Sequence, residues 1–234
     1  MKDGAKQLLE RFPRLYLEVL RVKRRGHWSV DWIVDRNTDC VIEGFPRSAN
    51  SFAHWAFRRS QPEDCVLKVG THTHSPAQVI QAVRWDIPTM LCIRPPRSAV
   101  RSAVAFQVEL TEREGGAFPD ERVTIAMREA AARWRFFHEQ ILPVKDGFFV
   151  APFDRVVKDY QTVSKEFTDW SGKGWVPWTP ERVSVKELTE KSFHTGPNAH
   201  REEIKERVGA AIDSAGIDDT LKVCEEIYGR IVPS

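Results

Sequence analysis

Short apolar runs alternate with segments of helical periodicity through most of this chain, and that alternation constrains its fold more than any other feature. The runs are Cys40–Gly44, 65–69, Thr89–Ile93 and 148–151. Runs of this length and composition are typical of strands buried on both faces. Strands that alternate with helices pair in parallel. The sequence therefore predicts an α/β fold, a three-layer sandwich with a central, mainly parallel sheet and helices on both faces.

Helical periodicity is clearest in Asp120–Ile141, where an apolar face follows Pro119 and two acidic residues. Other helices are expected near 5–24, 51–59, 77–85, 99–106, 156–170, 201–212 and 218–228. We interpret the 234 residues as one domain in three parts. They are a basic N-terminal helix (1–30), a core sheet with its ligand loops (38–170), and an irregular loop with C-terminal helices (171–234).

Composition indicates an ordinary globular protein, since 41% of the residues are hydrophobic and 29% are charged. The formal net charge of +2 argues against nucleic-acid binding, although residues 1–27 hold eight basic and three acidic residues, a net charge of +5. The four cysteines form no CxxC pair, and the sequence has neither a signal-peptide pattern nor a long apolar segment. We expect a cytoplasmic protein.

The first loop after a predicted strand reads Phe45-Pro46-Arg47-Ser48-Ala49-Asn50-Ser51. Its small side chains leave backbone N–H groups open to an anion, the following helix start is partly positive, and Arg47 adds a full charge. The loop therefore predicts a phosphate site. It lacks the second glycine and the lysine of the GxxxxGK[ST] nucleotide loop, and an ordinary helix cap is the alternative interpretation.

A pair of histidines follows the second apolar run, in Thr71-His72-Thr73-His74-Ser75-Pro76. An imidazole titrates near neutral pH, so either ring suits a general base at the end of a strand. A zinc pair would need a third protein ligand, and no telling ligand spacing accompanies these two. Polar loop histidines without a chemical role are the remaining interpretation.

A second anion site is predicted after the third run. Arg94 leaves the strand, and Arg97, Arg101 and Ser102 follow in the next helix. Arg94 and Ser102 are eight residues apart. They meet one ligand only if the chain turns back through the start of a helix, and a solvated basic helix cap is the alternative.

Together, the three loops resemble the sulfotransferases that use 3′-phosphoadenosine 5′-phosphosulfate (PAPS), most of all their soluble bacterial-type members. The segment 46–51 is similar to the family's PKSGTT or PRSGTT loop, and Thr73-His74-Ser75-Pro76 is similar to its THxP motif. Arg94 and Ser102 keep the spacing of the family's 3′-phosphate pair. Phe153-Asp154 resembles a structural motif after the fourth strand, so the resemblance covers residues 38–170.

The resemblance implies a P-loop-like form of the sandwich and a metal-independent transfer of a sulfuryl group from PAPS to an acceptor hydroxyl. The product nucleotide would be adenosine 3′,5′-bisphosphate. His74 would be the general base, with His72 as the fallback, and Arg47 would stabilise the leaving oxygen. Backbone N–H groups of Ser48, Ala49, Asn50 and Ser51 would hold the 5′-phosphate, and Arg94 with Ser102 the 3′-phosphate. A small molecule, a glycan or a lipid remains open as the acceptor.

Three departures from the family pattern concern the cofactor loops. Arg47 stands where many members have lysine, and Ala49 replaces a glycine, which requires a backbone conformation that alanine can adopt. The C-terminal Arg-Lys-Gly loop that closes over the 3′-phosphate is not recognisable. We expect either His194-Thr195-Gly196 or the basic residues His200 and Arg201 in its place.

Two rival functions remain open. A magnesium-dependent nucleotide kinase or NTPase would use a similar sheet, but the first loop lacks its lysine and Arg94 follows the third run in place of an acidic ligand. A non-catalytic nucleotide-binding or interaction module, docked on an anionic membrane surface, is favoured by the basic N-terminus. Trp175 and Trp178 are weak candidates for acceptor contacts, and the polar residues 109–114 for a mobile lid.

Overall fold

The computed structural model describes residues 3–190, 199–213 and 215–232. The chain divides into two compact units, each built from two stretches of sequence. Residues 1–93 and 143–195 form the first unit, and residues 94–142 and 196–234 form the second.

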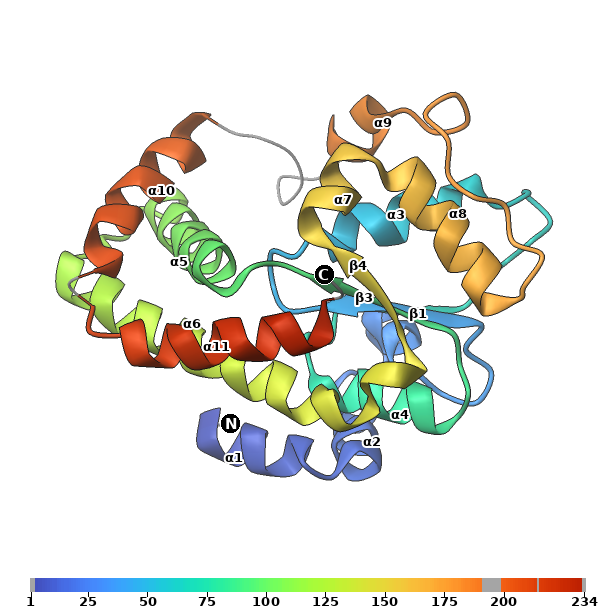
Figure 1. The fold of residues 1–234 in the computed structure, drawn as a ribbon, viewed down its shortest axis with the longest axis horizontal. Helices are drawn as coiled ribbons and strands as arrows, with labels where there is room; N and C mark the ends of the chain where they lie inside the picture. Colours follow the sequence, from blue (N-terminus) through green and yellow to red (C-terminus); the bar gives the residue numbers. More distant parts are fainter. Residues whose placement is uncertain (1–2, 191–198, 214, 233–234) are drawn as a thin grey trace. The chain divides into compact units, whose positions relative to one another are not determined.

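A four-stranded, all-parallel sheet forms the centre of the first unit (Figure 1). Its strands are β1 (Cys40–Gly44), β2 (Val69–Gly70), β3 (Thr89–Ile93) and β4 (Phe149–Pro152), in the order β2-β1-β3-β4. Val41 in β1 pairs with Gly70 on one side and with Thr89 on the other. Both β1 and β3 are buried along their whole lengths, as expected for strands covered on both faces. The predicted α/β fold with a parallel sheet is confirmed.

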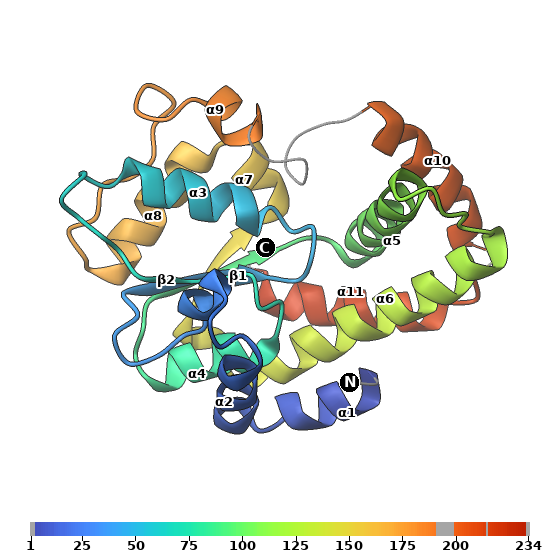
Figure 2. The same cartoon turned by 180° about the vertical axis from the view of Figure 1, so that it is seen from behind.

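Helices cover both faces of the sheet, which makes the first unit a three-layer sandwich (Figure 2). On one face lie α3 (Asn50–Ser60), α7 (Phe153–Lys158) and α8 (Tyr160–Ser171). On the other lies α4 (Pro76–Arg84), with α2 (Pro13–Lys23) packed against it. The further helical segments are α1 (Asp3–Glu10), η1 (Trp28–Trp32), η2 (Leu142–Gly147) and α9 (Val185–Glu190).

The strand order explains why α3 and α4 lie on opposite faces. The chain moves outward from β1 to β2 through α3, and then crosses back past β1 to β3 through α4. Parallel crossovers share one hand, so two crossovers in opposite directions leave their helices on opposite sides of the sheet. Ligands of such sheets collect at the carboxyl ends of the strands where the order reverses, which here are β1 and β3.

Two apolar clusters hold these layers together. One packs α3, α7 and α8 on the sheet and includes Ile42, Phe57 and Phe167. The other lies on the α4 side and includes Leu17 and Val41. Burying a side chain of this size contributes about 1.5–3 kcal/mol, so each cluster stabilises its layer by several such increments.

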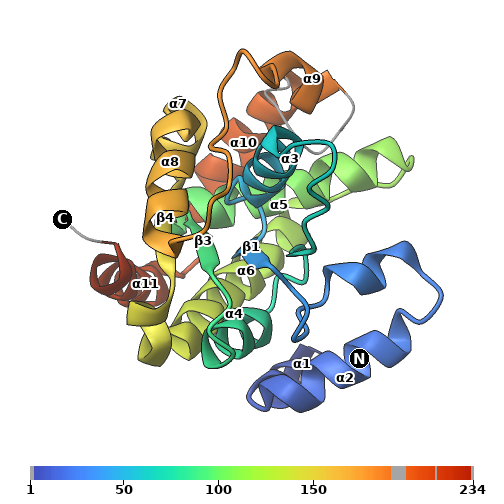
Figure 3. The same cartoon turned by 90° about the vertical axis from the view of Figure 1, so that its right-hand side faces the viewer.

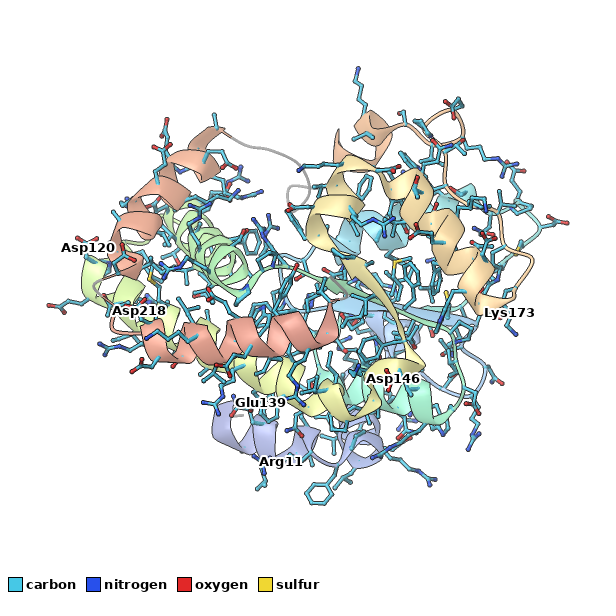
Figure 4. All side chains as sticks on the ribbon, viewed as in Figure 1. Arg11, Asp120, Glu139, Asp146, Lys173 and Asp218 are labelled. Atoms are coloured by element: carbon cyan, nitrogen blue, oxygen red, sulfur yellow. The ribbon has the colours of Figure 1, made fainter. Side chains whose placement is uncertain are left out.

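The second unit is helical in the residues that the structure describes. It contains α5 (Pro96–Arg113), α6 (Asp120–Ile141), α10 (Ala199–Ile212) and α11 (Asp218–Ile231). Helix α10 packs along α5, and α11 packs along α6 (Figure 3). Asp120 and Asp218 stand in the acidic first turns of α6 and α11 (Figure 4), where they complement the helix dipole. Within the described ranges, no helix has both the length and the apolar character needed to cross a membrane.

Three elements differ from the sequence prediction. The run 65–69 forms a strand only from Val69 onward, because Val66 is 83% exposed and cannot contribute a buried strand. The helix expected over 156–170 is two helices, since α7 ends at Lys158. The next residue, Asp159, accepts a hydrogen bond from the Thr162 N–H (3.2 Å) with its carboxylate and so caps α8. The irregular segment expected over 172–200 includes α9.

Candidate functional site

Two loops at the carboxyl ends of β1 and β2 carry most of the predicted site residues. The first joins β1 to α3, and the second joins β2 to α4. The hydroxyl oxygen of Ser51 lies 2.8 Å from His72 Nε2, and His74 Nδ1 lies 2.9 Å from the carbonyl oxygen of Gly44. The first unit therefore brings the predicted phosphate loop and both histidines together.

Glu43 organises these loops, and the sequence analysis missed it. Its carboxylate is completely buried at the end of β1. One oxygen accepts a hydrogen bond from the Gly44 N–H (3.0 Å). The other accepts from the Thr73 N–H and hydroxyl (both 2.9 Å) and from the His74 N–H (3.3 Å). It also accepts from the Gln78 side chain (3.1 Å), so the buried charge is fully surrounded by donors.

His74 is held in the orientation that a general base needs. Its Nδ1 faces the carbonyl oxygen of Gly44, and because a carbonyl only accepts, Nδ1 carries the hydrogen. The Nε2 atom of the neutral ring therefore keeps its lone pair. Glu43 Oε1 lies 3.6 Å from Nδ1, on the side of the ring opposite to the free Nε2. The His74 side chain is 30% exposed, so a substrate can reach it.

His72 uses both of its ring nitrogens inside the protein. Nε2 lies 2.8 Å from the hydroxyl of Ser51, and Nδ1 lies 2.9 Å from the hydroxyl of Thr71. The ring also packs 4.8 Å from that of Trp32. These contacts suit His72 to positioning Ser51 better than to the fallback role of base. In the described part of the chain, no group of three or more His, Cys, Asp and Glu side chains is placed to hold a metal ion.

Backbone strain is concentrated in the same two loops. Arg47, Ala49, His72 and His74 have φ values of 70°, 67°, 50° and 48°. A side chain in this left-handed region costs about 1–2 kcal/mol per residue. Such strain persists only where neighbouring contacts hold it, and Glu43 does this for the histidine loop by binding its amides. Ala49 has the conformation that the glycine of the resembled loop would supply.

The predicted phosphate loop presents buried polar groups at the start of α3. The hydroxyl of Ser48 and the side-chain NH₂ of Asn50 have no hydrogen-bond partner among the described residues. Ala49 stands at the N-cap and offers no side-chain acceptor, so the first N–H groups of α3 lack an intrahelical partner. The Ser48 N–H is already used, since it donates to the carbonyl of Phe45 (3.2 Å). Buried groups of this kind fit an oxygen-rich ligand that supplies the missing partners.

Arg94 and Ser102 belong to the second unit, at the start of α5. Arg94 directly follows β3, and its Nε donates to the hydroxyl of Ser98 (2.9 Å). Ser98 and Ser102 are one turn apart and share a face of α5. The hydroxyl of Ser102 is buried, with no hydrogen-bond partner in the part of the chain that the structure describes. Helix α5 therefore begins between Arg94 and Ser102, which is one condition for the pair to meet a single ligand.

Two weaker candidates have structural roles. Trp178 is buried, and its indole N–H donates to the carbonyl of Val183 (3.0 Å), while Trp175 packs against the same apolar cluster. Both tryptophans therefore hold their loop to the core. The mobile lid expected at 109–114 is wrong, because α5 continues to Arg113 and Glu109 is completely buried in it.

Two segments were expected to take the place of the C-terminal phosphate loop, and the structure describes only one of them. His194-Thr195-Gly196 lies outside the described residues. Arg201 is 1% exposed and forms an ion pair with Glu109, so its guanidinium is engaged within the second unit. His200 is exposed, with Nε2 3.4 Å from Glu112.

No protein-family model, no curated protein and no solved structure matches this chain. The chemistry of the site is therefore interpreted from its own residues, among which the arrangement of Glu43, Gly44 and His74 is the most informative.

Proposed function

We propose that this chain is a PAPS-dependent sulfotransferase with a P-loop-like fold, which transfers a sulfuryl group to an acceptor hydroxyl. The observation that carries the proposal is the orientation of His74, whose Nδ1–H is directed at the Gly44 carbonyl. Beside it lies a strained loop in which the buried Ser48 hydroxyl and Asn50 NH₂ have no partner among the described residues. The order of the three loop motifs, each after a parallel strand, supports the same function.

His74 acts as the general base in this proposal. Its Nε2 takes the proton of the acceptor hydroxyl as the acceptor oxygen forms its bond to sulfur. Bound PAPS supplies the activated sulfuryl group, and the bond from sulfur to the bridging oxygen of the 5′-phosphate breaks with its electron pair left on that oxygen. The Glu43 carboxylate, 3.6 Å from Nδ1, stabilises the imidazolium that forms on His74.

The loop after β1 provides the ligands of the 5′-phosphate. Arg47 places a positive charge where negative charge develops on the leaving oxygen. The N-terminus of α3 adds its dipole and its N–H groups, and Ser48 and Asn50 add the buried groups to which the described residues offer no hydrogen-bond partner. Arg94 and Ser102 bind the 3′-phosphate in this proposal, supported by the buried hydroxyl of Ser102, which has no hydrogen-bond partner within the described ranges.

A magnesium-dependent kinase or NTPase is less well supported. Its phosphate loop uses a lysine directly before Ser or Thr, whereas this loop has Asn50 before Ser51. In such a kinase or NTPase, the third strand along the chain is followed by an acidic residue that binds magnesium. In this chain, β3 is followed by Arg94.

Binding of adenosine 3′,5′-bisphosphate tests the proposal without knowledge of the acceptor. A ligand that binds only the folded state raises the thermal midpoint. The midpoint is measured with the bisphosphate, ATP, GTP and 5′-AMP, each with and without magnesium. We expect a metal-independent rise with the bisphosphate, which Arg94→Ala abolishes and the exposed control Arg84→Ala retains. A rise confined to magnesium nucleotides would support the kinase, and no rise with any nucleotide would reject both functions.

A second variant separates the chemistry from the binding. His74→Ala is expected to lower the transfer of labelled sulfuryl from PAPS to a panel of hydroxyl acceptors by about 10²–10⁴-fold, the usual contribution of a general base. The rise of the midpoint with the bisphosphate should remain in this variant. A parallel loss of both would show that His74 supports binding or folding and is not the base.

A further inference from the structure

Exposed apolar side chains are concentrated in one short segment of the first unit. Six of the twelve large apolar side chains that are exposed in the described residues fall between residues 8 and 28. They are Leu8, Phe12, Leu15, Val19, Val22 and Trp28, with exposures from 39% to 75%. Single exposed apolar residues need no explanation, whereas a cluster of this kind marks an interaction surface.

Most of this surface is one face of α2. Leu15, Val19 and Val22 are spaced by four and three residues, so they form a stripe along the helix, and Phe12 directly precedes it at the N-cap. A different face of α2 buries Tyr16 and Leu17 on the α4 side. The helix therefore has an apolar face that its own fold uses and a second that faces solvent.

Basic side chains border the exposed stripe. Helical spacing places Arg14 on one side of the stripe and Lys23 on the other, and both residues are exposed. Arg11 projects away from the ribbon beside the end of α1 (Figure 4), and the exposed Arg25 follows α2. Long basic side chains of this kind keep their stems beside an apolar surface while their charges reach outward.

Trp28 extends the same surface beyond α2. Its ring is 63% exposed and meets that of Trp32 edge-on, with the ring centroids 4.4 Å apart. An indole with an apolar body and a polar N–H suits the interface between lipid and water. The half-buried ring of Trp32 lies 4.8 Å from that of His72 in the histidine loop.

We propose that residues 8–28 form a docking surface for an anionic lipid membrane. Anionic headgroups complement the net charge of +5 in residues 1–27, and the stripe on α2 enters the boundary between headgroups and acyl chains. A second copy of this chain fits less well, because pairing the stripes would bring two such charges together. The helix is also only 11 residues long, well short of the three or four heptads that sustain a coiled coil.

Sedimentation with vesicles tests the docking directly. The full chain is mixed with vesicles of phosphatidylcholine alone and with vesicles that also contain phosphatidylserine. We expect the protein to sediment with the anionic vesicles, to remain in solution with phosphatidylcholine alone, and to be released as salt screens the charges. Equal sedimentation with both kinds of vesicle, or with neither, would overturn the proposal.

Two double variants separate the apolar and the basic contributions. Leu15→Ser with Val22→Ser, and Lys23→Glu with Arg25→Glu, are each expected to weaken vesicle binding by about tenfold or more. Val66→Ser and Lys173→Glu are matched controls on exposed residues of the same unit (Lys173 is labelled in Figure 4), and they should bind as the original chain does.

The controls also separate docking from folding, self-association and catalysis. The thermal midpoint shows whether each variant folds. If the apolar and the basic double variants both fold and still bind vesicles normally, the proposal is overturned. A chain that is dimeric in solution and becomes monomeric in Leu15→Ser with Val22→Ser would assign the stripe to a second copy instead. Because nucleotide binding is measured without vesicles, failure of the sulfotransferase proposal leaves this test unaffected.

Discussion

Ala49 carries part of the strain of the phosphate loop in a single residue. Its φ of 67° costs alanine about 1–2 kcal/mol, a penalty that glycine does not have. Glycine also loses more chain entropy on folding than alanine does, and this cancels about 0.4–1 kcal/mol of the stability gained by removing the strain. We predict that Ala49→Gly raises the free energy of unfolding by about 0.5–1 kcal/mol, measured by urea denaturation.

A matched substitution checks that the gain comes from the backbone conformation. Ala132 is exposed within α6, and Ala132→Gly should lower the free energy of unfolding by about 1 kcal/mol, as glycine does inside helices. If Ala49→Gly destabilises the protein as Ala132→Gly does, Ala49 does not hold a strained conformation.

His54 makes stability depend on pH. Burial, with smaller contributions from the neighbouring His72 and Arg58, lowers the pKa of this histidine to about 3. Below about pH 6.5 the unfolded chain binds a proton that the folded chain excludes, so stability falls as the pH falls. Between pH 7 and pH 5 this residue alone is expected to lower the free energy of unfolding by about 2 kcal/mol.

Replacing the ring isolates that contribution. His54→Leu should reduce the difference in unfolding free energy between pH 7 and pH 5 by about 2 kcal/mol, measured by urea denaturation at each pH. Each variant is compared with itself, so a general loss of stability cancels. An unchanged difference between the two pH values would mean that His54 has the same pKa in the folded and the unfolded chain.

The residues of the candidate site were predictable to different degrees. Arg47, His74 and Arg94 each stand in a recognisable motif directly after a predicted strand. Glu43 could have been noticed only because it is the one acidic residue in an otherwise apolar predicted strand. Its partners are up to 35 residues away and come together only when the strands pair and α4 packs, which a local pattern cannot show.

At the scale of elements, one buried ion pair joins α5 to α10. Arg201 in α10 pairs with Glu109 in α5, and both side chains are almost completely buried. Arg201→Leu removes the buried partner of the Glu109 carboxylate, while the half-exposed Arg113 lies 4.0 Å from it, so the free energy of unfolding should fall by about 3–5 kcal/mol. Denaturation by urea measures the loss.

Two further variants test whether charge is the cause. Adding Glu109→Leu to Arg201→Leu removes the stranded carboxylate, and the double variant should recover most of the lost stability. Arg135→Ala breaks the exposed pair of Arg135 with Glu139 in α6 and should cost no more than about 0.5 kcal/mol. A double variant no more stable than Arg201→Leu would assign the loss to packing.

The elements themselves were predictable where the pattern was long. The prediction of α6 is confirmed at both ends, because 22 residues repeat one apolar face behind an acidic first turn. The strand 65–69 was wrong, because a short apolar run does not reveal which of its residues will be covered. The break between α7 and α8 depends on one capping residue, Asp159, in an otherwise continuous pattern.

At the scale of the whole molecule, the second unit depends on the C-terminal helices. Its apolar cluster includes Ile204, Val208, Ile212, Ile217 and Leu221 from α10, α11 and the segment between them. Burying five such side chains contributes about 8–15 kcal/mol, which is comparable with the whole free energy of unfolding of a typical domain. The clusters of the first unit contain residues of that unit alone.

We therefore predict that truncation after Glu190 unfolds α5 and α6 and leaves the parallel sheet folded. Hydrogen exchange, compared between the truncated and the full chain, should show protection lost in α5 and α6 and kept in β1 and β3. Continued protection of α5 and α6 would mean that these helices are stable without α10 and α11.

The division of each unit between two stretches of sequence also affects how the protein forms during synthesis. The strands β1, β2 and β3 leave the ribosome before α5 and α6, whereas the helices that cover α5 and α6 are made well after them. Until residues 199–231 emerge, the apolar faces of two long helices stay open on a nascent chain. The slow step in folding this protein should therefore follow the synthesis of α10 and α11, which compete with chaperones that bind exposed apolar helices.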